Sequence, residues 1–190
     1  MKTVLFLAGS TMHRSVNSRL SLAAADLAED VFGDALLVQR VDLMQFALPP
    51  IDQEAMFDSA LQEMVALFAR AEGLFISSDE YTGSFSAQIR LAVNWLMLCE
   101  TAETPLIADK PTVLAGAAPI GVGGMRGFPA LQHLLKAAGL RVFPQQIRLG
   151  TTNSLFDTDG ALLPAPRAQL LNGALRKLAD TVGVKTLAKT

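Results

Sequence analysis

The stretch Val4-Leu5-Phe6-Leu7-Ala8-Gly9-Ser10-Thr11-Met12-His13-Arg14-Ser15-Val16-Asn17 decides the fold of this chain. Its first five residues are apolar, as in a strand that is buried on both faces of a sheet. The small and polar residues that follow are typical of a tight turn, and a helical pattern begins directly after them. A strand, a turn and a helix in this order bind anions, because the first N–H groups of the helix have no backbone partner and its dipole favours negative charge. The turn is therefore predicted to bind a phosphate group.

The side chains of this turn fit a phosphate. Ser10 and Ser15 supply hydroxyl donors, and Arg14 supplies a forked positive charge. Asn17 either bonds the phosphate or caps the helix, and capping alone is also the alternative for Ser15. His13 and Arg14 are equally compatible with solvated turn positions. Because neither G-x-G-x-x-G after this strand nor G-x-x-x-x-G-K-[ST] anywhere is present, a phosphate site of another kind is expected.

The composition indicates a globular α/β chain whose partner is a small molecule. The 190 residues, 51% of them hydrophobic and 18% charged, predict one domain over residues 1–190 with a substantial core. A formal net charge of -2 gives no electrostatic argument for nucleic acid or an anionic membrane. Cys99 is the only cysteine and there are two histidines, so neither an internal disulfide nor a metal site is expected. Because no apolar run approaches the roughly 20 residues of a membrane span, we expect a soluble cytoplasmic protein.

Apolar runs of strand length alternate with segments of helical period, which is typical of βα units around a parallel sheet. The predicted strands are residues 3–8, 35–42, 73–77, 111–116 and 140–146, and the predicted helices are 16–32, 53–70, 84–98, 127–138 and 166–182. This alternation predicts an α/β flavodoxin-like three-layer sandwich, with a five-stranded parallel sheet of order 2-1-3-4-5. Ligands of such sheets bind at the carboxyl ends of the strands, beside the switch point between the first and third strands. The rule selects the loops 9–17, 78–84 and 117–127.

Together these loops resemble those of the NAD(P)H-dependent FMN reductases, a flavodoxin-like family that includes quinone, azo-dye and chromate reductases. The resemblance extends from Gly9 to about Pro144. The first loop of the family reads G-S-x-R-x-x-S-x-N-x-x-L, and the matching residues are Gly9, Ser10, Ser15, Asn17 and Leu20. Met12 stands at the arginine position, so Arg14 is the candidate replacement for that charge.

The second loop of the family reads P-x-Y-N-x-S, and its helix reads L-K-x-A-x-D-W. This chain has Asp79-Glu80-Tyr81-Thr82-Gly83-Ser84 and then Ile89-Arg90-Leu91-Ala92-Val93-Asn94-Trp95. The spacing is intact, and the departures from the pattern include Asp79, Thr82 and Asn94. The resemblance places the ring of Tyr81 beside a flavin, and the alternative is a tyrosine at the sheet edge with its hydroxyl in water. Trp95 has helical spacing from Leu91 and Leu98, which favours a place in the core or an interface.

The third loop resembles the G-G-x-R-G/A segment of the family and reads Ala117-Ala118-Pro119-Ile120-Gly121-Val122-Gly123-Gly124-Met125-Arg126-Gly127. Glycine at this place lets the backbone approach a ligand plane closely. Many relatives have serine where Ala117 and Ala118 stand, so one hydroxyl contact to the flavin is expected to be missing. Taken alone, the loop is equally compatible with a plain connection.

The resemblance implies that FMN is the cofactor, that its N5 accepts hydride from NADPH or NADH, and that the electrons pass to a small acceptor such as a quinone or a free flavin. The protein then supplies position and electrostatics, and no residue is assigned as a catalytic acid or base. A homodimer or homotetramer is also implied. The candidate cofactor-binding residues are Ser10, Thr11, Arg14, Ser15, Val16, Asn17, Asp79, Glu80, Tyr81, Thr82, Gly83, Ala117, Gly123 and Gly124.

Two other functions stay open at this point. The first is a non-enzymatic electron carrier, although the hydroxyl-rich T/S-x-T-x-x-T loop and acidic surface of flavodoxins are absent. The second is a flavin-poor relative that acts as a nucleotide-binding module. It is favoured by the departures at Met12, Thr82 and Ala117, because each lost hydrogen bond is worth about 0.5–1.5 kcal/mol.

Overall fold

The computed structural model describes residues 1–12, 15–118, 126–150, 155–157 and 165–184. Its strands are β1 (Lys2–Ala8), β2 (Leu36–Asp42), β3 (Gly73–Ser77), β4 (Pro111–Ala118), β5 (Arg141–Val142) and β6 (Ile147–Gly150). The helices are α1 (Val16–Phe32), α2 (Ser59–Arg70), α3 (Ala87–Cys99), α4 (Gly127–Ala137) and α5 (Ala165–Thr181). All paired strands are parallel in the order β2-β1-β3-β4-β5, and β6 also pairs with β4. The predicted fold and strand order are confirmed.

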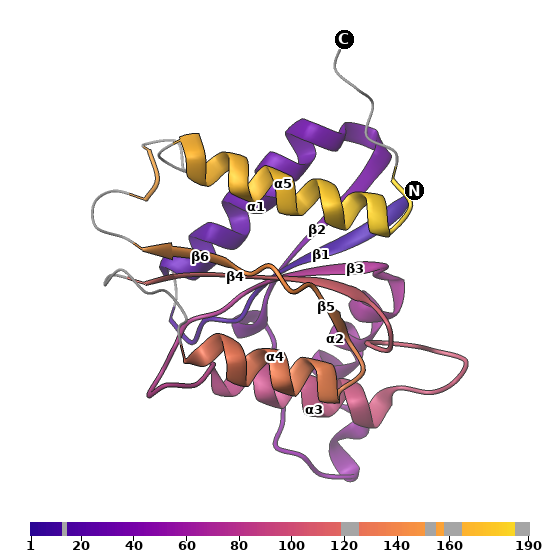
Figure 1. Cartoon of the computed structure of the whole chain (residues 1–190). Coiled ribbons are helices and arrows are strands. Elements are labelled where there is room, and N and C mark those ends of the chain that lie inside the picture. The colour runs from indigo at the N-terminus through magenta and orange to yellow at the C-terminus, as the bar shows by residue number, and fades with distance from the viewer. Residues whose placement is uncertain (13–14, 119–125, 151–154, 158–164, 185–190) are drawn as a thin grey trace.

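Helices cover both faces of the sheet, with α1 and α5 on one face and α2, α3 and α4 on the other (Figure 1). Alternate residues of β1 enter the two cores: Val4 and Phe6 pack toward α1 and α5, whereas Leu5 and Leu7 pack toward α2, α3 and α4. This double coverage explains why the central strands are apolar runs without alternation. Among the described helices, none is long and apolar enough to cross a membrane.

The predicted fifth strand at residues 140–146 is wrong in its extent. The structure has two short strands instead, β5 against the beginning of β4 and β6 against its end. Pro144 lies between them, and because proline has no N–H to donate, it interrupts the ladder. The chain resumes pairing at Ile147, so β5 and β6 together fill the fifth position of the sheet.

Local capping shifts the starts of two predicted helices. The carboxylate of Asp58 accepts hydrogen bonds from the N–H groups of Ala60 and Leu61, so α2 begins at Ser59 and a separate 3-10 turn, Glu54–Phe57, precedes it. Ser86 caps α3 by accepting from the N–H of Ile89 at 3.2 Å. The predicted start of α1 is confirmed, with Ser15 as its cap.

Trp95 lies in the core, as its spacing favours. Its side chain is 1% exposed, and Nε1 donates to the carbonyl oxygen of Pro49 at 2.8 Å. Cys99 is half-buried at the end of α3, and burial raises the pKa of its thiol. Such a thiol is a packing group rather than a thiolate nucleophile.

Candidate functional site

The carboxyl ends of β1, β3 and β4 lie side by side at one edge of the sheet, because the three strands are neighbours in register. Ala8 pairs with Ser77 of β3, and Ser77 pairs with Ala115 of β4. The side chain of Asn17, in the first turn of α1, contacts the ends of β3 and β4 and is 1% exposed. The structure thus brings the described starts of the three predicted loops together around one buried amide.

The amide of Asn17 makes four hydrogen bonds to three residues. Its Oδ1 accepts from the N–H of Ala117 at 2.7 Å and from the hydroxyl of Ser77 at 3.3 Å. Its Nδ2 donates to the carbonyl oxygen of Ala117 at 3.0 Å and to the carboxylate of Asp79. These contacts use both amide hydrogens and the carbonyl oxygen. In this arrangement the side chain of Asn17 connects the first turn of α1 to the end of β3, to Asp79 and to the end of β4.

Asp79 extends this network to the tyrosine. The hydroxyl of Thr11 donates to Tyr81 Oη at 2.9 Å, and Tyr81 Oη donates to Asp79 Oδ2 at 3.3 Å. A continuous set of hydrogen bonds therefore runs from Thr11 through Tyr81, Asp79 and Asn17 to Ala117. The family's proline at position 79 has no side-chain acceptor, so the carboxylate is a feature of this chain that the loop pattern does not indicate.

The anion cradle predicted at the start of α1 has two backbone donors without a partner among the described residues. The N–H groups of Val16 and Asn17 form no hydrogen bond to any described residue. Ser15 Oγ accepts from the N–H of Ser18 at 3.0 Å, and Ser10 Oγ accepts from the N–H of Met12 at 3.0 Å. The hydroxyls thus shape the turn, while two backbone donors and the helix dipole stay available to a phosphate. This donor set fits the phosphate group of FMN.

Glu80 and the hairpin after it hold the second loop in place. Glu80 Oε2 accepts from the N–H groups of Arg126 and Gly127, at 3.1 and 2.9 Å, and so caps the start of α4. Tyr81 and Ser84 exchange two backbone hydrogen bonds of 2.8 Å. The two residues between them, Thr82 and Gly83, have φ values of 51° and 75°, as a type I′ turn requires.

Thr82 is strained in this turn, because a β-branched residue is disfavoured at positive φ. We expect Thr82→Asn, which restores the residue of the family pattern, to raise the free energy of unfolding by about 1 kcal/mol. Gly83→Ala is the opposite control and is expected to lower it by a similar amount, since its φ is also positive. Urea denaturation with unchanged m-values measures both. A Thr82→Asn variant that is less stable than the wild type would show that Thr82 is not strained.

Two glycines at the edge of the site serve packing. A Cβ on Gly9 would lie 2.2 Å from Ile89 Cδ1, and one on Gly116 would lie 2.6 Å from the ring of Phe128. Close contact with α3 and α4 therefore accounts for both glycines. The predicted site residues Arg14, Gly123 and Gly124 lie outside the described residues.

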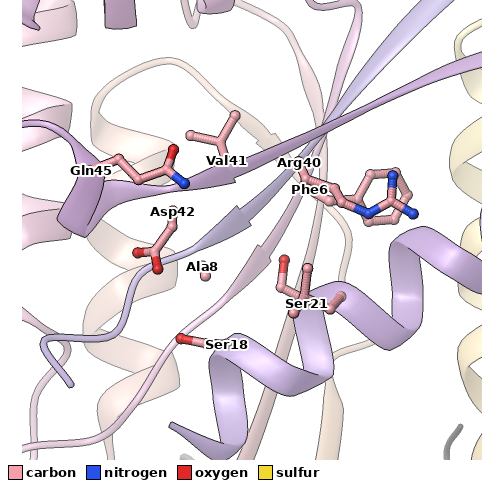
Figure 2. Close-up of a pocket in the computed structure, with 9 residues that line it drawn as sticks. Phe6, Ala8, Ser18, Ser21, Arg40, Val41, Asp42 and Gln45 are labelled. Carbon is pink, nitrogen blue, oxygen red and sulfur yellow. The ribbon is translucent and has the colours of Figure 1, made fainter. Parts of the chain in front are cut away.

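A pocket of about 200 Å³ lies beside the cradle, between α1 and the ends of β1 and β2 (Figure 2). Its polar residues include Ser21, Asp42 and Gln45, none of which the sequence patterns single out. Only the position of Asp42 could have indicated this pocket from the sequence. Asp42 is the last residue of a predicted strand and so lies at the ligand-binding edge of the sheet.

Comparison with known proteins identifies the family. The NADPH-dependent FMN reductase family matches residues 1–153. The NADH:(hydroxy)cinnamate reductase subunit CrdA of Vibrio ruber is 26% identical over 144 residues, which are 73% of this chain and 69% of that protein. The structure of FerB, a flavoenzyme NAD(P)H:(acceptor) oxidoreductase from Paracoccus denitrificans, has a TM-score of 0.77 at 18% identity and covers 98% of this chain and 100% of its own. The structure of an oxidoreductase from Corynebacterium diphtheriae has a TM-score of 0.73 at 18% identity, and the match covers 98% of this chain and 99% of that chain.

The two structures support the flavodoxin-like fold. The family match shows the class of activity. It confirms the predictions of an oxidoreductase, of FMN as cofactor and of NAD(P)H as co-substrate. With the anion cradle and the Tyr81 loop at the switch point of the sheet, the chain belongs to the NADPH-dependent FMN reductase family.

Proposed function

We propose that this protein passes electrons from NAD(P)H by way of FMN to a small acceptor, such as a quinone or a free flavin. The observation that carries the proposal is the set of hydrogen bonds from Thr11 to Ala117, which connects the loops after β1 and β3 to the end of β4. FMN, when bound, supplies the hydride chemistry, and the protein supplies its position and surroundings.

Named residues have distinct parts in this proposal. The N–H groups of Val16 and Asn17 hold the phosphate, supported by the dipole of α1. Tyr81 presents its ring to the flavin, and its side chain is 37% exposed, which leaves a surface for a flat ligand. Asp79 and Thr11 orient that ring through its hydroxyl. The backbone at Ala117 is fixed by Asn17 and borders the same place.

The first test is flavin binding by the purified protein. We expect flavin fluorescence to be quenched with a preference for FMN over riboflavin of about 5- to 150-fold, because hydrogen bonds to a charged group are worth about 1–3 kcal/mol. A preference for FAD, or no quenching at tens of micromolar FMN, would contradict the cradle.

The second test separates a reductase from an electron carrier. FMN-loaded protein is mixed with NADH or NADPH without oxygen, and the flavin absorbance near 450 nm is followed before 1,4-benzoquinone is added. We expect bleaching by a nicotinamide and recovery of absorbance with the quinone. Protein that binds FMN but is bleached by neither nucleotide would favour the carrier function.

The proposed assembly is a homodimer or homotetramer. α3 exposes Met97 and Leu98 by 49% and 54%, and Phe57 of the 3-10 turn before α2 is 88% exposed. Exposed apolar side chains of this kind mark interfaces. Sedimentation at micromolar concentration is expected to show a dimer or larger species, and Leu98→Glu to shift it toward about 20 kDa. A wild-type monomer would rule the assembly out.

We also infer one domain over residues 1–190, because the two described cores lie on opposite faces of one sheet. A cytoplasmic location is proposed on the single cysteine, since disulfide pairs are typical of oxidising compartments.

A further inference from the structure

One carboxylate of the candidate site has no partner cation among the described residues. Asp79 is partly buried, and its side chain is held by two neutral donors, the amide of Asn17 and the hydroxyl of Tyr81. The hydroxyl of Ser78 donates to the Asp79 carbonyl oxygen at 2.9 Å and fixes the main chain as well. Within the described part of the chain, no lysine or arginine forms an ion pair with Asp79. The carboxylate is therefore held in place while its charge stays uncompensated by these residues.

The neighbouring carboxylate has a different environment. Glu80 accepts from the N–H groups of Arg126 and Gly127 at the start of α4, where the helix dipole is positive. Its charge is thus partly neutralised by the protein itself. Of the two acids in the loop after β3, Asp79 is the one whose charge is left to act on a ligand at the site.

Asp79 lies within one hydrogen bond of both groups that the proposed function gives to FMN. Asn17 belongs to the phosphate cradle through its backbone N–H, and Tyr81 presents its ring to the flavin. Asp79 also lies two residues after Ser77, the last residue of β3, which neighbours β1 and β4 at the switch point of the sheet. A flavin held by these groups is therefore in the electrostatic field of the Asp79 carboxylate.

This charge has a chemical effect because flavin reduction changes the charge at the site. Hydride transfer takes two electrons and one proton from NAD(P)H, which becomes NAD(P)⁺, and adds one negative charge to the flavin. A fixed carboxylate opposes the added charge, so it weakens the binding of reduced flavin relative to oxidised flavin. We propose that Asp79 lowers the reduction potential of the bound FMN and so makes the reduced protein a stronger electron donor to its acceptor. The inference rests on the proposed function and concerns a position where the family pattern has proline.

The reduction potential of the FMN-loaded protein tests this inference. The flavin is reduced stepwise with dithionite beside a reference dye, so the measurement needs no nicotinamide. Asp79→Asn keeps the size of the side chain and an acceptor oxygen, and we expect it to favour reduced over oxidised flavin about tenfold, a rise of about 30 mV. Asp79→Ala is expected to shift the potential in the same direction. Asp79→Glu retains the charge and is expected to stay within about twofold of the wild-type ratio.

Two further variants separate the charge from the position of the tyrosine ring. Tyr81→Phe removes the hydrogen bond to Asp79 but leaves the carboxylate, so we expect it to change the same ratio by less than about twofold. Asp34→Asn removes a carboxylate from the exposed turn before β2 and is expected to have no effect. Equal shifts in Asp79→Asn and Tyr81→Phe would assign the effect to ring orientation and overturn the inference.

Kinetics give a second readout, in which the two half-reactions change in opposite directions. We expect the flavin of Asp79→Asn to be reduced by NADH or NADPH about threefold faster than that of the wild type, and to be reoxidised by 1,4-benzoquinone about threefold more slowly. Slowing of both steps, or an unchanged potential, would overturn the inference and leave the proposed function standing. A raised potential in Asp79→Asn, with neither nicotinamide bleaching the wild type, would support the inference and reject the proposed function.

Discussion

Replacing Asn17 with Ala is expected to lower the free energy of unfolding by about 3–5 kcal/mol, because it leaves several buried polar groups without partners. Ser77 and Ala117 are 0% and 6% exposed, so water does not replace the lost bonds to the Ser77 hydroxyl and to the Ala117 N–H and carbonyl. Urea denaturation measures the change. Asn94→Ala is the matched control on α3, since the Asn94 side chain bonds to no described residue, and we expect it to stay within about 0.5 kcal/mol of the wild type.

The same variant shows what Asn17 does for the flavin. If its amide positions Asp79 and the ends of β3 and β4, as its four hydrogen bonds indicate, FMN and riboflavin lose affinity by similar factors. A loss confined to FMN would instead make the amide a phosphate ligand, which is the alternative that the loop pattern left open. Fluorescence titrations of both flavins, made under conditions where the variant is folded, separate the two roles.

Asn17 also illustrates what the sequence could predict. Its place in the turn after β1 followed from local signals, because a cap, a helix start and an apolar strand are each coded within a few residues. Its hydrogen-bond partners could not be predicted, since Ser77 lies 60 residues away and Ala117 lies 100 residues away. Those pairings depend on the register of β1, β3 and β4, which no local pattern specifies.

The errors have the same origin. The apolar run of residues 140–146 predicted one strand, but strand pairing depends on a donor that Pro144 does not have. The pocket at Asp42 arises where α1 packs beside β2, and neither element shows this from its own sequence. The carboxylate of Asp79 departs from the family pattern, and its hydrogen bonds with Tyr81 and Asn17 could not be predicted from that pattern.

A second polar residue is buried at the amino ends of the strands, opposite the candidate site, and its replacement is expected to stabilise the protein. Lys110 precedes β4 and is 8% exposed, and its Nζ donates to the carbonyl oxygen of Phe68. Burial lowers the pKa of its ammonium group from 10.5 to about 8, against the opposing effect of Glu100 and Glu72. Since the Phe68 carbonyl also accepts from the N–H of Ala71 at 3.2 Å, removing the ammonium does not leave it unpaired. We expect Lys110→Met to raise the free energy of unfolding at pH 7 by about 1–3 kcal/mol.

The pH dependence identifies the cause. Below pH 8 the ammonium of Lys110 is charged in both states and its burial costs the folded state fully. Between pH 8 and 10.5 the unfolded state binds more protons, so the stability of the wild type rises with pH relative to Lys110→Met. The advantage of the variant should therefore shrink across that window and vanish above it, whereas Lys136→Met, on the exposed side of α4, should shift stability by less than about 0.5 kcal/mol without this dependence. An advantage of Lys110→Met that is the same at pH 7 and pH 10.5 would attribute it to packing by methionine and reject the buried charge as its source.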